Sequence, residues 1–494
     1  MGLEDLDLVV ALRNTGIQEY PEKSPFDPPA LYPELPSSGL DPSNQVYAAV
    51  RQLFMDLGLD LSRQGTPQWN PLGDFIKPGM TVFIKPNTVA HEHGKGKCLF
   101  SILVHPSVIR PILDYACKAL QKSGAIIIGD SQLYSSDYEK MLKTSGLGEF
   151  LAWYQPQTNV PMNWFDLRLN KAKRTWLYGR WARVKIEHDP QGYQFVDLGD
   201  KSCFKDIDPA RLRIAIASHK NMCKHHSNGK HEYLFPRSFL QSDVVINIAK
   251  LKTHRRTAVT LALKNYMGLP AYKDSLPHFT TGSPEEGGDQ YIHPSFRKRI
   301  GTALHDIIQT SRFIPVKFVC AVVKSAIWSS RRIVPFKDDV SEAMWWGNDT
   351  VWRTLHDLNR AVRYADKKGV MQDAPQRRQL VIVDGVMGGE GDGPLACDPV
   401  QAGVLVAGTS PVSVDAVAAS VMGFDVERIP LIHNAFDAGT NPPPLFSGKA
   451  QDIIIIRDGE RESFAQLIDR PHLGFHAHPQ WAGHVEKDIK TSGQ

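Results

Sequence analysis

Positively charged side chains gather directly after an apolar run in residues 243–270, DVVINIAKLKTHRRTAVTLALKNYMGLP. The run is rich in β-branched residues, which predicts a strand buried on both faces: Val244, Val245, Ile246 and Ile248. The charged and amide side chains that follow are Lys250, Lys252, His254, Arg255, Arg256, Lys264 and Asn265. Ligands of open α/β sheets bind just beyond the carboxyl ends of the strands. The pattern therefore predicts a site for an anionic ligand, with a solvated basic loop as the alternative.

Two of these residues have the chemistry of catalytic groups. His254 can move a proton as a general base, and the ammonium group of Lys264 can stabilise a developing anion. Further polar residues stand near the ends of apolar runs and are expected to bind the substrate: Lys85, Asn87, His105, Asp130, Lys252 and Asn265. Because parallel strands align their carboxyl ends, these side chains are expected to meet at one edge of a sheet. The alternative is that each caps a helix or forms a turn.

Three carboxylates suggest a site for a divalent cation such as magnesium: Asp384, Glu390 and Asp415. Asp384 ends an apolar run and precedes GVMGGEGDGP, in which five of ten residues are glycine. Glycine lets a backbone approach a ligand closely. The segment matches neither the Walker lysine pattern nor the dinucleotide-binding fingerprint. Ligand binding and a tight structural turn are both open for this segment.

Histidine and cysteine residues bear on other metal sites. Four histidines lie in residues 219–231, and such density suggests metal binding: His219, His225, His226 and His231. Adjacent residues of a strand point to opposite faces, so an anion-binding loop or a polar surface is favoured for this segment. The six cysteines are scattered and form no CxxC pair, so we expect neither a zinc ribbon nor an iron–sulfur cluster.

The apolar segments alternate between strand and helix patterns, which predicts an α/β fold. MTVFIKPN, an amphipathic helix after His105-Pro106, and AIIIGDS together predict a βαβ unit with parallel strands. We expect two lobes of such units around a cleft, with a mixed insertion. The predicted regions are an N-terminal extension (1–75), a first lobe (76–270) with an insertion of short antiparallel strands (137–210), a helical connection (271–370), and a second lobe with a C-terminal tail (371–494).

The composition argues against several classes of protein. The chain of 494 residues has a net charge of +4, whereas nucleic-acid binding usually requires a strongly basic face, so no nucleic-acid partner is expected. No run of eighteen apolar residues occurs, so no membrane partner is expected. The start, MGLEDLDLVV, lacks a secretory signal, and the scattered cysteines favour a cytoplasmic location. A homodimer is left open.

Four ordered blocks of the chain resemble a known family. VFIKPN, HPSVIRPILDYACKALQKSGAIIIGDS, the 243–270 segment, and VDGVMGGEGDGP with AGVLVAGTSPVSVDAVAASVMGFD are similar to the domain-of-unknown-function 362 family, across roughly residues 80 to 435. Some members of that family carry a ferredoxin-like segment with clustered cysteines, which this chain lacks. The resemblance implies an α/β fold and leaves the activity open.

A second likeness concerns the spacing of His254 and Lys264, which are ten residues apart. It resembles that of the catalytic histidine and the cofactor-bearing lysine in the nickel-pincer lactate racemases. Thr260, Leu261 and Ala262 stand where those enzymes have a glycine-rich segment. The likeness therefore implies a general base beside an ammonium group rather than a covalent pincer cofactor.

Together these features predict an enzyme that acts on a small metabolite bearing a carboxylate or phosphate. Proton transfer is the favoured chemistry, with lysines stabilising the anion and a divalent metal as a possible cofactor. One alternative is a noncatalytic metabolite-binding or accessory protein of a biosynthetic pathway. Another is magnesium-dependent phosphoryl transfer or hydrolysis.

Overall fold

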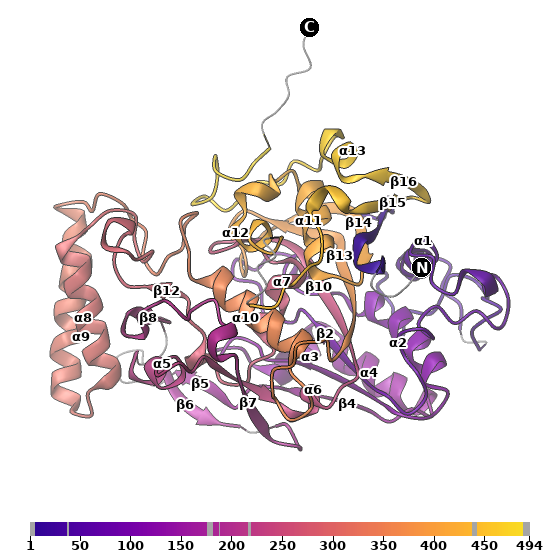
Figure 1. The fold of residues 1–494 in the computed structure, drawn as a ribbon, viewed down its shortest axis with the longest axis horizontal. Helices are drawn as coiled ribbons and strands as arrows, with labels where there is room; N and C mark the ends of the chain where they lie inside the picture. The colour runs from indigo at the N-terminus through magenta and orange to yellow at the C-terminus, as the bar shows by residue number, and fades with distance from the viewer. Residues whose placement is uncertain are drawn as a thin grey trace, which may run out of the picture.

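The computed structural model describes residues 5–36, 39–174, 181–186, 188–215, 219–436 and 442–487. Its centre is a ten-stranded sheet with the order β16-β15-β1-β14-β13-β10-β2-β3-β4, and β11 pairs with β10 (Figure 1). The strands are β1 (Val9–Asn14), β2 (Thr81–Pro86), β3 (Ala125–Asp130), β4 (Met162–Asp166), β10 (Val244–His254), β11 (Ala258–Val259), β13 (Arg378–Glu390), β14 (Asp398–Gly408), β15 (Ile454–Arg457) and β16 (Glu460–Ser463).

The middle of the sheet is parallel, from β13 through β10, β2 and β3 to β4. Helix α2 (Pro106–Leu120) connects β2 to β3, so the predicted βαβ unit and the α/β class are confirmed. The strands of both predicted lobes lie in this one sheet, because β13 pairs with β10 from Val244 opposite Arg378 onward. Strand β14 runs antiparallel between β13 and β1.

Helices cover both faces of the sheet and enclose two apolar cores. One core contains residues of α1 (Gln45–Asp56), α2, α3 (Tyr138–Thr144) and α4 (Leu147–Tyr154). The other contains residues of α7 (Leu261–Asn265), α10 (Val351–Tyr364) and α11 (Pro411–Met422). Alternate residues of β10 enter the two cores, Ile246 and Ile248 on one side and Val245 and Leu251 on the other. This is the pattern of a strand buried on both faces.

The region predicted as an insertion contains more helix than expected. One antiparallel pair lies within it, between β5 (Asn170–Arg174) and β6 (Trp181–Lys185), whereas β7 (Tyr193–Asp197) pairs with β9 (Glu232–Pro236), which lies beyond the predicted insertion. However, α3 and α4 are helices, and β4 extends the main sheet. The remaining short elements are β8 (Leu212–Arg213), α5 (His219–His225), α6 (Arg237–Leu240), β12 (Phe279–Thr280), α12 (Pro430–His433) and α13 (Phe464–Asp469).

A helical hairpin projects at one end of the molecule, at the left of Figure 1. It consists of α8 (Phe296–Thr310) and α9 (Ile314–Ser329), and lies within the region predicted as a helical connection. Among the helices of the described residues, none combines the length and the apolar character that crossing a bilayer requires.

Strand β10 is longer than its apolar run predicts. The basic segment was expected to lie beyond the carboxyl end of the strand, but the strand continues to His254. The extension is possible because Lys250 is neutralised, with its Nζ 3.0 Å from Asp384 Oδ2 and both side chains fully buried. Tyr20 donates a hydrogen bond of 2.6 Å to the other oxygen of Asp384. This buried ion pair joins β10 to β13 below the candidate site.

Removal of one partner of this pair tests its role. Asp384→Ala leaves the Lys250 ammonium group buried without a counter-charge, so the free energy of unfolding should fall by about 3–5 kcal/mol. Urea unfolding followed by circular dichroism measures the loss. Asp392→Ala, which breaks an exposed ion pair with Lys95, is the control and should leave stability nearly unchanged. Equal effects of the two variants would contradict this role.

Candidate functional site

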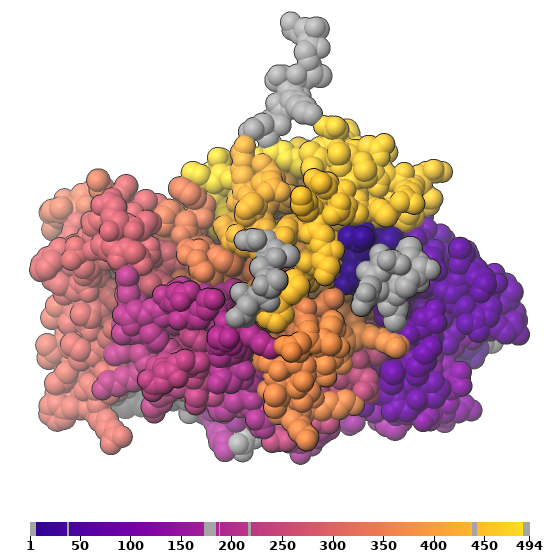
Figure 2. Space-filling model, viewed as in Figure 1, coloured from indigo at the N-terminus to yellow at the C-terminus, as the bar shows by residue number. Residues whose placement is uncertain are grey.

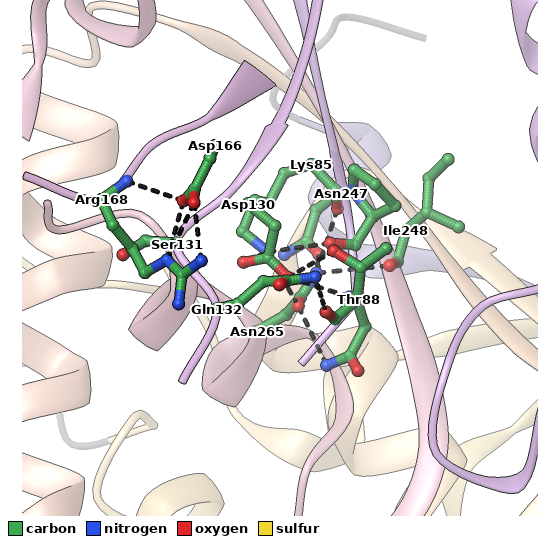
Figure 3. Close-up of polar contacts among 12 residues, drawn as sticks. Lys85, Thr88, Asp130, Ser131, Gln132, Asp166, Arg168, Asn247, Ile248 and Asn265 are labelled. Carbon is green, nitrogen blue, oxygen red and sulfur yellow. Dashed lines mark hydrogen bonds and ion pairs between the residues drawn. The ribbon is translucent and has the colours of Figure 1, made fainter. Parts of the chain in front are cut away.

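A buried ion pair connects the carboxyl ends of β2 and β3. The Nζ atom of Lys85 lies 2.8 Å from Asp130 Oδ1, and both side chains are almost fully buried. The other oxygen of Asp130 accepts hydrogen bonds from the backbone N–H and the hydroxyl of Thr88, at 2.8 and 2.9 Å (Figure 3). Asp130 is thus already occupied by three donors. It compensates Lys85 and fixes the end of β3.

Asn265 links this ion pair to β10 and α7. Its Nδ2 donates to Asn247 Oδ1 at 2.7 Å and to the Lys85 carbonyl at 3.1 Å. Its Oδ1 accepts from Lys85 Nζ at 3.2 Å and from Asn87 Nδ2 at 3.1 Å (Figure 3). Both polar ends of Asn265 are therefore used within the protein. The side chain positions its neighbours, although it was predicted to bind substrate.

Gly268 allows a loop to pass close to the same ion pair. A Cβ atom at this position would lie 2.2 Å from Asp130 Oδ1 and 2.9 Å from Lys85 Nζ. The Gly268 carbonyl accepts a 2.7 Å hydrogen bond from the backbone N–H of Ser131. Only glycine fits this approach without displacing the ion pair.

Beside this network lies a cavity of about 180 Å³. Six of the eight residues predicted as catalytic or substrate-binding line it: Asn87, Asp130, Lys252, His254, Lys264 and Asn265. Lys85 stands behind the lining, and His105 lies elsewhere. Four basic residues outside the predicted catalytic and substrate-binding set also line the cavity: Arg255, Arg256, Lys273 and His278.

Lys252 and Lys273 are buried and have no carboxylate partner among the residues that the structure describes. Lys252 Nζ donates to the carbonyl of Ile102 at 2.7 Å and to Asn87 Oδ1 at 3.2 Å. Lys273 Nζ donates to the carbonyl of Ser131 at 2.7 Å. Burial lowers the pKa of Lys252 to about 8 and that of Lys273 to about 7. These two ammonium groups are thus held by hydrogen bonds to neutral carbonyl and amide oxygens rather than by carboxylates.

Lys264 has no hydrogen-bond or ion-pair partner within the described part of the chain. Its side chain lines the cavity and is partly buried. Burial lowers its pKa to about 7, and the positive charges of Lys252 and Lys273 add to that effect. At neutral pH the amine is therefore only partly protonated, which suits either anion binding or proton transfer.

The two histidines of the cavity are held in opposite tautomers. His254 Nδ1 accepts a 3.0 Å hydrogen bond from the backbone N–H of Arg256, so the neutral ring carries its proton on Nε2. His278 Nδ1 lies 2.9 Å from the carbonyl of Leu276 and must donate to it, which leaves Nε2 as an acceptor. Burial first, and then neighbouring cations, hold the pKa of both rings well below its ordinary value.

Polar atoms without partners line the same cavity. The hydroxyls of Ser131 and Thr260 and the Nε of Arg255 are buried and have no hydrogen-bond partner among the described residues. Ser131 is 2% exposed and Thr260 is 4% exposed. A buried polar group without a partner is costly, so these atoms indicate space for a polar ligand.

The turn that carries Lys264 is strained and is held from outside. Ala258 and Leu261 adopt positive φ angles of 60° and 43°, a conformation that side chains rarely tolerate and that concentrates at functional sites. Asp415 of α11 accepts the backbone N–H groups of Ala262 and Leu263 at 2.7 and 2.8 Å. Burial raises the pKa of Asp415 well above its ordinary value. This residue positions α7.

The three carboxylates suggested for a metal ion have separate roles. Asp384 pairs with Lys250, and Asp415 holds α7. Glu390 lies at the end of β13, where it pairs with the exposed His476 at 2.9 Å. Within the described ranges, no three His, Cys, Asp or Glu side chains are grouped so as to hold a metal ion.

His105 caps a helix instead of facing the cavity. Its ring accepts a hydrogen bond from the backbone N–H of Ser107 at the start of α2, and stacks on Tyr20 with ring centroids 4.2 Å apart. Its backbone N–H donates to Asp384. His105 was predicted to bind the substrate, but in the structure it caps a helix, which was the alternative for these residues.

The histidine-rich segment 219–231 is used for packing. His226 is fully buried, with Nε2 donating to the Ser275 carbonyl at 2.7 Å and Nδ1 facing His231 at 3.2 Å. His225 pairs with Glu232 at 2.8 Å. The glycine-rich segment 385–394 continues β13 as far as Glu390, and its last residue, Pro394, lines the cavity. A Cβ on Gly393 would lie 1.9 Å from the Thr253 carbonyl, so glycine permits close packing on β10.

Replacement of Lys264 by methionine should stabilise the ligand-free protein. The pKa of this lysine is about 7 in the folded state against an ordinary 10.5, so protonation opposes folding. The destabilisation is complete below pH 7 and fades as pH rises toward 10.5. Lys264→Met should therefore raise the free energy of unfolding at pH 7 by roughly 1–3 kcal/mol, and by less at pH 9.

Urea unfolding at the two pH values provides the measurement, with Lys205→Met, at an exposed lysine, as the control. A loss of stability in Lys264→Met at both pH values would show that the ammonium group has a counter-charge.

A family model, Domain of unknown function (DUF362), matches residues 207–420. No curated protein and no solved structure matches the chain. The matched segment is shorter than the resemblance across residues 80 to 435, and the comparisons give no support to the likeness to lactate racemases. The segment matched by the family model, residues 207–420, includes β10, α7 and β13, and therefore contains Lys252, His254 and Lys264. Residues 207–420, which carry the centre of the candidate site, thus match the model of the DUF362 family, in agreement with the resemblance seen in the sequence.

Proposed function

We propose that the cavity binds a small metabolite with at least two negative charges, and that the protein is an enzyme that transfers a proton on it. One observation carries the proposal. Three ammonium groups, those of Lys252, Lys264 and Lys273, line one cavity without a carboxylate partner among the described residues. A dicarboxylate or a phosphate ester would supply the missing charge and the acceptors.

The size of the cavity limits the ligand. A volume of about 180 Å³ lies below the roughly 300–1,000 Å³ typical of pockets for drug-sized ligands. A small acid fits this description better than a nucleotide cofactor does. The unpartnered hydroxyls of Ser131 and Thr260 add hydrogen-bond groups for it.

The tautomers assign different roles to the histidines. His278 Nε2 has a free lone pair and is our candidate for the general base. The Nε2–H of His254 can donate to the oxygen on which charge develops, beside the ammonium group of Lys264. A bound dianion would offset the nearby cations and raise the pKa of His278 toward neutrality. His254 was predicted as the base, but its Nδ1 is already occupied.

The alternatives differ in how well the geometry supports them. Magnesium-dependent phosphoryl transfer is not supported, because Asp384, Glu390 and Asp415 are engaged with separate partners. A noncatalytic binding protein would use the same cationic cavity. A measurement of turnover, rather than of binding, therefore distinguishes the proton-transferring enzyme from the noncatalytic binding protein.

Anion binding should depend on Lys264 and on pH. Isothermal titration with inorganic phosphate and a panel of small dicarboxylates should give an affinity that falls as pH rises through about 7 to 8, because the lysines lose their charge. Lys264→Met should weaken binding about 10- to 100-fold. Lys205→Met should bind as the parent protein does. Affinity that is independent of pH and of Lys264 would reject the site.

Proton transfer can be tested by isotope exchange. In deuterium oxide, a bound substrate should incorporate deuterium at the carbon next to its acidic group. Mass spectrometry of the recovered substrate measures this incorporation. His278→Asn keeps a donor for the Leu276 carbonyl but removes the base, so exchange should slow by about 10²–10⁴-fold with binding retained. A ligand that binds tightly and never exchanges in the parent protein would favour the noncatalytic alternative.

A further inference from the structure

The hairpin of α8 and α9 shows an inverted distribution of polarity. Helix α9 contains no Asp or Glu, and its solvent-facing side is apolar, with Val319 58% and Val322 51% exposed. Cys320 marks the buried side, and Lys317 and Lys324 are partly buried on that side. A surface helix normally buries its apolar face and exposes its charges. Here the apolar face is the exposed one among the residues that the structure describes.

The apolar surface extends beyond α9 over the whole hairpin and its flanks. Its other strongly exposed members are Phe296, Ile307, Phe313, Ile314, Ile333 and Val334. The hairpin forms one end of the molecule, seen at the left of Figure 2. Contiguous apolar patches of this kind mark interaction surfaces.

The same segment is strongly basic. Residues 296–334 contain eight Lys or Arg and one acidic residue, a net charge of +7, whereas the whole chain carries +4. The single carboxylate, Asp306, is paired with Arg213 at 3.0 Å. Exposed arginines stand at both ends of α9, Arg312 at one and Arg331 and Arg332 at the other. Lys298 pairs with Asp338 and Arg299 with Glu286, so the positive charge that coincides with the apolar surface comes mainly from the arginines at the two ends of α9.

We propose that this hairpin docks on the surface of an anionic lipid bilayer. The outward face of α9 would enter the boundary between headgroups and acyl chains, and the flanking arginines would contact lipid phosphates. A helix of 16 residues is about 24 Å long, less than the ~30 Å of a bilayer core, so it lies on the surface. The sequence predicted no membrane partner from the lack of a spanning segment, which surface docking does not need.

A second copy of the chain is the competing occupant, and charge disfavours it. In a two-fold symmetric contact the same patch meets itself, which would bring together two hairpins of +7 each. Like charges across an interface are repulsive. Anionic lipid instead supplies the opposite charge together with an apolar layer.

Vesicle flotation of the full chain tests the apolar part of the proposal. The protein should float with vesicles of phosphatidylcholine mixed with phosphatidylserine, less with phosphatidylcholine alone, and less at high salt. The double variant Val319→Glu, Val322→Glu should lose binding. The matched control Leu31→Glu, Leu61→Glu, at leucines of similar exposure elsewhere, should retain it. Circular dichroism verifies that each variant is folded.

Charge reversal tests the basic part. Arg331→Glu with Arg332→Glu should reduce partitioning at least about tenfold, and Lys23→Glu with Lys205→Glu, at exposed lysines elsewhere, should not. Failure of the parent protein to float with anionic vesicles overturns the proposal. So does a concentration-dependent dimer in sedimentation that Val319→Glu, Val322→Glu abolishes while vesicle binding is absent, because the face then belongs to a second copy.

Discussion

Enclosure of ammonium groups in a cavity, to which repulsion between neighbouring cations adds, is the constraint on which the site depends. Lys252, Lys264 and Lys273 share a small cavity, and the carboxylate that lines it within the described part of the chain, Asp130, is already paired with Lys85. Charge held in this way opposes folding, so the rest of the fold must provide enough stability to maintain it. A ligand that brings negative charge would relieve that repulsion. The same arrangement therefore makes the free protein less stable and prepares it to bind.

The strands and helices around the cavity explain how its ammonium groups and histidine rings are held close to one another. Strand β10 is paired on both sides as far as Ile248, and beyond it Lys252 pairs with β13 and His254 with β11, so both residues project from a supported strand. Asp415 fixes the strained turn before α7, and Asn265 connects that helix to the ends of β2 and β10. Rigid support of this kind keeps catalytic groups oriented without a bound ligand.

Much of this arrangement could be predicted from the sequence, because it depends on periodicity and on the ends of strands. The alternation of apolar segments identified the α/β class, and the polar residues after those segments included six that line the cavity. Lys273 and His278 could not be found in this way. Each is an isolated residue in an irregular segment after Pro270, without a spacing that indicates a role.

Other errors arose where tertiary contacts override a local pattern. The basic run after Ile248 suggested that the strand ends there, but pairing with Asp384 keeps Lys250 within the strand. A histidine before a proline is equally compatible with a ligand contact and a helix cap, and only the fold shows that His105 is a cap. The tautomers of His254 and His278 depend on single backbone groups, which no sequence pattern reveals.

The continuous sheet has a consequence for how a ligand reaches the cavity. Many two-lobed enzymes close on a ligand by a hinge movement between their lobes. Here β10 and β13 are hydrogen-bonded from Val244 to Lys250, and such a movement would break these hydrogen bonds. The two halves are thus locked together. Admission of a ligand must rely on smaller movements of bordering loops, such as the one that carries Pro394 and Leu395.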